Sequence, residues 1–99
     1  MKDKKSILLV EDEASLSMII KDALEEEDFQ VITAGNGPHG IARFYKYAPD
    51  LIIADVMMPE IDGFEMIRRI RKENKEVPVL FLSARSSTDD IVFGFELGA

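Results

Sequence analysis

Short apolar runs alternate along the chain with longer segments in which apolar residues recur every three or four positions. The runs 6–10, 51–54 and 77–83 are bounded by polar or turn residues, which is typical of strands buried on both faces. The run 29–34 mixes polar Gln30 and Thr33 with apolar residues, as an edge strand with one wetter face would. The pattern therefore predicts four strands.

The segments that follow each run have helical periodicity. The apolar positions of the four predicted helices are Leu16, Ile19, Ile20, Ala23 and Leu24, then Ile41, Ala42, Tyr45 and Ala48, then Phe64, Ile67 and Ile70, and finally Ile91 and Phe95. Pro38 suits the start of the second helix, and Ser87 or Thr88 can cap the fourth. Strands that alternate with helices predict a doubly wound α/β fold with a parallel sheet. No repeat or linker divides residues 1–99, so one domain is expected.

Composition narrows the chemistry that this domain can perform. The 99 residues include no cysteine, so a bound metal would be a hard cation held by oxygen atoms. The net charge of −7 disfavours direct binding to nucleic acid or to an anionic membrane. No apolar stretch is long enough for a membrane span or a signal peptide, which predicts a cytoplasmic location.

Acidic residues follow two of the predicted strands. Glu11 and Asp12 come after the first strand, and Asp55 ends the third. Because the carboxyl ends of parallel strands meet at one edge, the three carboxylates should share a pocket that favours Mg²⁺. An aspartate can also act as a nucleophile toward phosphorus. Ser83, at the end of the fourth strand, would offer a hydroxyl to a phosphoryl group on Asp55.

These residues together resemble the receiver domains of two-component response regulators. The resemblance covers the whole chain, and its motifs are Glu11-Asp12, Asp55, Met58-Pro59-x-x-Asp62-Gly63, Ser83-Ala84 and Leu97-Gly98-Ala99. It implies a flavodoxin-like doubly wound sheet, here with strand order 2-1-3-4 and four helices. The domain would be a signalling module that catalyses at most its own phosphorylation and dephosphorylation.

The resemblance also implies a role for each site residue. Asp55 would accept a phosphoryl group from a sensor histidine kinase. Asp12, Asp55 and the main-chain carbonyl of Met57 would hold Mg²⁺, and Glu11 would act through a water molecule. Ser83 would be the hydroxyl that switches the domain between two conformations.

The sequence departs from this family at its C-terminal end. Receiver domains continue into a fifth strand, a lysine that pairs with the acceptor aspartate, and a fifth helix, and this chain has none of the three. We expect the edge of the fourth strand to be exposed and part of one sheet face to be uncovered. The chain should then self-associate through that edge or face.

Three other functions are compatible with parts of the sequence. Gly35, Gly37 and Gly40 match the G-x-G-x-x-G pattern of a dinucleotide site, although Pro38 removes an N–H from the helix start and the acidic pair goes unexplained. A phosphatase with an aspartate nucleophile would need a second carboxylate at position 57, which is Met. The third alternative is a structural fragment that no longer accepts phosphate.

Overall fold

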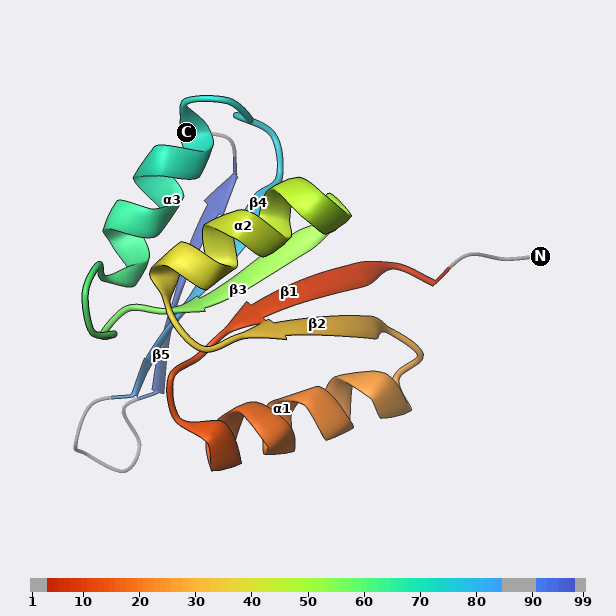
Figure 1. Cartoon of the computed structure of the whole chain (residues 1–99). Coiled ribbons are helices and arrows are strands. Elements are labelled where there is room, and N and C mark those ends of the chain that lie inside the picture. Colours follow the sequence, from red (N-terminus) through yellow and green to blue (C-terminus); the bar gives the residue numbers. More distant parts are fainter. Residues whose placement is uncertain (1–3, 85–90, 98–99) are drawn as a thin grey trace.

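Five strands form one sheet in the order β2-β1-β3-β4-β5 (Figure 1). The computed structural model describes residues 4–84 and 91–97. The strands are β1 (Ser6–Val10), β2 (Gln30–Ala34), β3 (Leu51–Asp55), β4 (Pro78–Ala84) and β5 (Ile91–Leu97), and the helices are α1 (Ala14–Glu26), α2 (Gly37–Tyr47) and α3 (Gly63–Arg71). β1 to β4 are parallel, and β5 runs antiparallel to β4. None of the described helices has the length and apolar content to cross a bilayer.

Helices cover both faces of the sheet, which is why the central strands are apolar on both sides. On one face, Leu8 and Ile52 pack beneath α2 and α3 together with Phe44 and Met66. On the other face, Ile7, Leu9 and Ile53 belong to a second cluster to which α1 contributes Ile20 and Leu24. Figure 1 shows α1 alone on that side, beside β1 and β2. The predicted doubly wound architecture is confirmed.

The sheet face on which α1 packs is only partly covered. α1 has no fully buried residue, and Ile19 on its surface is 65% exposed. Leu80 and Leu82 of β4, on the same side of the sheet, are half-buried. Within residues 4–84 and 91–97, this sheet face is therefore only partly covered beyond α1, which agrees with the prediction in part.

The prediction of a fourth helix is wrong for residues 91–97, the part of that segment that the structure describes. Ile91–Leu97 forms the strand β5, while the predicted caps Ser87 and Thr88 lie outside the described residues. Five of its seven residues are β-branched or aromatic types or leucine, and Gly94 at its centre disfavours a helix. Pairing along β4 also satisfies backbone groups that would otherwise form an open edge. The predicted exposed edge of β4 is therefore wrong too, because β4 is paired on both sides.

The third helix buries a different set of residues from the one predicted. Met66, Ile67 and Ile70 are buried, whereas Phe64 is 56% exposed. The ring of Phe64 lies 4.7 Å from that of Phe81, so its inner side still packs on the sheet. The three-residue spacing identified the helix but placed its apolar face slightly too far toward Phe64.

Helix α2 begins with a side-chain cap that can be tested directly. The Asn36 side chain accepts a hydrogen bond of 2.8 Å from the backbone N–H of His39. We expect Asn36→Ala to lower the free energy of unfolding by about 1 kcal/mol, because this N–H then loses its partner. Chemical denaturation would measure the change. His39→Ala is the matched control: it keeps the N–H and should leave stability almost unchanged.

Candidate metal and phosphoryl site

The carboxylate cluster forms where two neighbouring strands end. Val10 pairs with Ala54 in the parallel register of β1 and β3, so the residues that follow them, Glu11 and Asp55, meet at the same edge. Asp12 is the next residue along the chain. Carboxylate oxygens of Glu11, Asp12 and Asp55 lie within 4.8 Å of one another. The structure thus brings together the three acidic residues that the sequence singled out.

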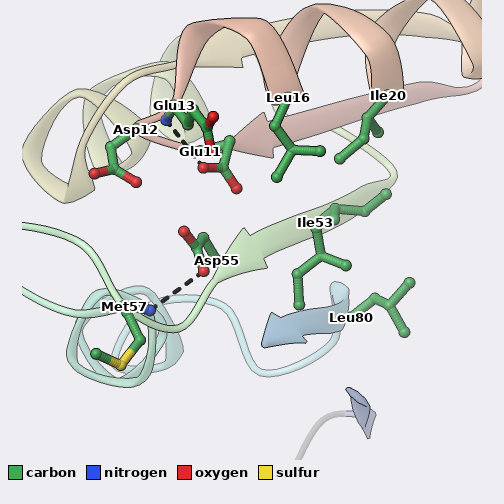
Figure 2. A pocket seen from close by; sticks show the side chains of 10 residues that line it. Glu11, Asp12, Glu13, Leu16, Ile20, Ile53, Asp55, Met57 and Leu80 are labelled. Atoms are coloured by element: carbon green, nitrogen blue, oxygen red, sulfur yellow. Dashed lines mark hydrogen bonds between the residues drawn. The ribbon is translucent and has the colours of Figure 1, made fainter. Parts of the chain in front are cut away.

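Backbone N–H groups hold two of these side chains in place. The N–H of Glu13 donates to Glu11 Oε2 at 2.9 Å, and the N–H of Met57 donates to Asp55 Oδ1 at 3.3 Å. Both bonds are drawn in Figure 2, where the carboxylates of Glu11 and Asp55 point into the same space. Glu11 is only 5% exposed, Asp55 is half-buried and Asp12 is exposed. The cluster is therefore oriented by the backbone before any ligand binds.

Burial and mutual repulsion make this cluster a poor place for three negative charges. Burial raises the pKa of Glu11 to about 7, and the nearby Asp55 and Asp12 carboxylates add to that rise. The pKa of Asp55 is also raised, chiefly by burial and then by the charge of Asp12, although its hydrogen bond from Met57 acts in the opposite direction. Without a counter-ion, the folded state favours a proton at this site.

This protonation predicts how the metal-free protein responds to pH. The folded protein holds a proton on Glu11 that the unfolded chain releases near pH 4.5, so stability falls as pH rises from about 4.5 to about 7. We expect a loss of about 1–2 kcal/mol over this range in EDTA, less than the full linkage value because water reaches the site. Thermal denaturation at several pH values would measure it.

Two variants isolate the contribution of Glu11. Glu11→Gln keeps an acceptor for the Glu13 N–H but cannot ionise, so its stability should depend less on pH than that of the parent protein. Glu13→Gln removes an exposed charge two residues away and should leave the slope unchanged. Equal slopes for the parent and Glu11→Gln would show that Glu11 does not titrate as described.

A cleft of about 490 Å³ opens beside the carboxylates (Figure 2). One end is acidic, with Glu11, Asp12 and Asp55. Its other lining residues are Glu13, Leu16, Ile20, Ile53, Met57, Leu80 and Leu82. The thioether of Met57 points away from the carboxylates and is exposed, while Met58 packs against the core. Met57 thus contributes its backbone to the edge of the site.

The donor set fits a hard divalent cation. Carboxylate oxygens are the ligands that Mg²⁺ prefers, and a cation would offset the repulsion among them. Asp12 and Asp55 are accessible enough to bind directly, whereas Glu11 is more deeply placed. Ser83 is the penultimate residue of β4, one position beyond Leu82, which pairs with Asp55. The position of its hydroxyl lies outside the described side chains.

Two supporting features were not predicted from the sequence. The N–H of Glu13 orients Glu11, and such a bond depends on the turn after β1 rather than on residue type. Gly63 lies against the backbone of Asp55: a Cβ at this position would be 2.3 Å from the Asp55 carbonyl oxygen. A glycine directly after the helix cap Asp62 was the available signal for this close approach.

The glycines of the G-x-G-x-x-G pattern have packing roles. A Cβ on Gly37 would lie 2.3 Å from Cγ1 of Ile61, and one on Gly40 would lie 2.7 Å from Sδ of Met66. Both glycines are buried. Close contact between α2 and its neighbours therefore explains these residues without a dinucleotide.

Comparisons with known proteins identify the family. The sequence model of the response regulator receiver domain matches residues 7–99. The transcriptional regulatory protein TrcR of Mycobacterium tuberculosis is 43% identical over 93 residues, which are 94% of this chain and 36% of TrcR. This chain spans between 36% and 42% of the length of the curated relatives it matches.

Solved structures agree with this assignment. The response regulator TrrA of Thermotoga maritima, in complex with Mg²⁺ and BeF, has a TM-score of 0.79 and 38% identity, with 83% of this chain and 71% of TrrA covered. TrrA in complex with the histidine kinase ThkA has a TM-score of 0.77 and 37% identity, with coverages of 84% and 72%. This chain belongs to the response regulator receiver domain family.

Proposed function

We propose that this chain is a phosphoacceptor module in which Asp55 receives a phosphoryl group from a sensor histidine kinase in the presence of Mg²⁺. The observation that supports this most strongly is the convergence of Glu11, Asp12 and Asp55 within 4.8 Å at the ends of β1 and β3. The raised pKa values of Glu11 and Asp55 indicate that this cluster needs a counter-charge. TrrA, a similar protein, has been solved with Mg²⁺ and BeF and also with a histidine kinase.

Each residue of the site has a distinct task in this proposal. Asp12, Asp55 and the main-chain carbonyl of Met57 would hold Mg²⁺, and Glu11 would act through a water molecule. When bound, Mg²⁺ would supply positive charge to offset the negative charge of the phosphoryl oxygens. An oxygen of Asp55 forms the new O–P bond while the P–N bond to the donor imidazole breaks and the imidazole leaves with the electron pair. The N–H of Met57 holds Asp55 in position through its other oxygen.

Phosphorylation would act as a conformational switch rather than as a step of substrate turnover. Ser83, next along β4 from the partner of Asp55, would donate its hydroxyl to the new phosphoryl group. That contact favours one of two conformations and so transmits the signal. The cytoplasm, where a kinase would meet the domain, is the proposed location.

We also propose that the chain self-associates, either through the sheet edge formed by β5 or through the open face beside it. β5 is the terminal strand of the sheet and has a single charged residue, Glu96. Such an edge offers backbone groups to a second strand. A monodisperse monomer by light scattering at micromolar concentration would contradict this part.

Calorimetric titration with Mg²⁺ tests the metal site, and a small phosphodonor tests the transfer. We expect Asp12→Asn to weaken Mg²⁺ binding at least about tenfold, because it removes a direct ligand. Glu60→Gln, which changes an exposed carboxylate in the neighbouring loop, should bind Mg²⁺ like the parent protein.

Incubation with acetyl phosphate and Mg²⁺ should add one phosphoryl group by intact mass, and EDTA should prevent it. No adduct with Mg²⁺ present would favour the structural-fragment alternative.

A further inference from the structure

The junction between β2 and α2 contains an asparagine followed directly by a glycine, and the proposed function uses neither residue. Asn36 is half-buried and caps α2, and Gly37 is the first residue of the helix. The backbone nitrogen of a glycine can attack the side-chain amide of a preceding asparagine, because no Cβ hinders its approach. The other asparagine of the chain, Asn74, precedes Lys75. Asn36 is therefore the asparagine with the more reactive neighbour.

The reaction that this pair can undergo is deamidation, which consumes only water. The Gly37 nitrogen loses its proton and forms a bond to Cγ of Asn36. The bond from Cγ to the amide nitrogen breaks, and that nitrogen leaves with the electron pair and takes up the proton as ammonia. The resulting succinimide ring adds water at one of its two carbonyls and opens to aspartate or isoaspartate.

The folded structure holds the two reacting groups ready but apart. Among the described residues, the Gly37 N–H donates no hydrogen bond, so no bond must break before its nitrogen reacts. The Asn36 side chain, in contrast, accepts the N–H of His39 at 2.8 Å. The backbone of Asn36 is extended, with φ −160° and ψ 174°, and ring closure requires ψ to rotate. The side chain must also leave its position as the helix cap.

The packing of Ile61 on Gly37 opposes this rotation. Gly37 is buried, and Cγ1 and Cδ1 of Ile61 occupy the space that a Cβ on Gly37 would need. Rotation about ψ of Asn36 moves Gly37 relative to Ile61, so the first turn of α2 must open before the ring can close. We propose that Asn36 is a site of spontaneous deamidation whose rate is set by the opening of this turn.

The two products have opposite effects on α2. Aspartate keeps an oxygen acceptor for the His39 N–H and adds a negative charge, which is favourable at a helix N-terminus. Isoaspartate lengthens the main chain by one CH₂ group and displaces the acceptor, so the cap is lost. The inference is independent of phosphotransfer, because it needs neither Mg²⁺ nor a phosphodonor.

Peptide mass spectrometry of the 99-residue chain after incubation in mildly alkaline buffer tests this inference, and Asn74 is the internal control. Asn74 is held by two N–H donors, those of Glu76 and Val77, and its neighbour Lys75 has a Cβ. We expect aspartate and isoaspartate at position 36 to form at least about tenfold faster than at position 74. Equal rates at the two asparagines would overturn the inference.

Ile61→Ala tests whether the first turn of α2 controls the rate. Loss of this packing should speed deamidation of Asn36 about threefold or more, with the same increase in hydrogen exchange of the His39 N–H. The rate at Asn74 should stay unchanged. Ile19→Ala is the matched control, because Ile19 is exposed on α1 and should alter neither rate. An unchanged rate at Asn36 in Ile61→Ala, or equal acceleration at both asparagines, would contradict control by this turn.

Discussion

Asp55→Asn is expected to abolish the phosphoryl adduct completely while the domain stays folded. Asparagine keeps the shape of the side chain and an acceptor for the Met57 N–H, but its amide is not a nucleophile toward phosphorus. The substitution also removes one charge from three crowded carboxylates. In EDTA near pH 7 the variant should therefore be as stable as the parent protein or more stable, by up to about 1 kcal/mol.

Intact mass after incubation with acetyl phosphate and Mg²⁺ measures the adduct, and thermal denaturation measures the fold. Glu60→Gln provides the control, since it removes a carboxylate from the same loop outside the cluster and should still be phosphorylated. Glu60 has a left-handed backbone (φ 73°), which the change to glutamine does not disturb further. An undiminished adduct on Asp55→Asn would place the acceptor at another residue.

Gly63→Ala is expected to cause the largest loss of stability of any single methyl addition in the site. Its Cβ would lie 2.3 Å from the carbonyl oxygen of Asp55 and 3.1 Å from Cα of Val56, and both are backbone atoms that cannot rotate away. The N–H of Gly63 is also bonded to the carbonyl of Val56 at 2.9 Å, which ties the start of α3 to the end of β3. We expect a loss of about 2–4 kcal/mol.

Gly35→Ala is the matched control for this prediction. No atom lies within 4 Å of a Cβ at position 35, so the change should alter stability by less than about 0.5 kcal/mol. Denaturant unfolding of the two variants gives the comparison. If Gly63→Ala folds, we also expect weaker Mg²⁺ binding, because relief of the clash must move Asp55 or the Met57 loop. Equal stability of the two variants would show that the β3–α3 junction is looser than described.

Most of the fold could be predicted because its determinants are local. The runs that form β1 and β3 are apolar on both faces. Both faces of the sheet must therefore be buried beneath other elements, which this pattern alone predicts. The segment Ile91–Leu97 was predicted incorrectly because two local signals, a possible cap at Ser87 or Thr88 and the spacing of Ile91 and Phe95, suggested a helix. Its strand structure depends instead on pairing with β4, a contact between segments that the hydrophobic period does not report.

The candidate site divides in the same way. Glu11, Asp12 and Asp55 were predictable because each follows directly from a strand end, and parallel strands bring such ends together. Two other features were not predictable from the sequence. They are the hydrogen bond from the Glu13 N–H that orients Glu11 and the apolar cleft between α1 and β4. Both depend on how far a turn bends and how much of a sheet a helix covers, which are properties of the assembled fold.

Reductive mapping of the phosphorylated residue tests the central claim most directly. Borohydride reduces an acyl phosphate to an alcohol, so a phosphorylated aspartate becomes homoserine, which peptide mass spectrometry can locate. After incubation with acetyl phosphate and Mg²⁺, we predict homoserine at position 55 alone, and none in a parallel sample with EDTA. Homoserine at Asp12 instead of Asp55, or no reduced residue in the Mg²⁺ sample, would contradict the assignment of Asp55 as the phosphoacceptor.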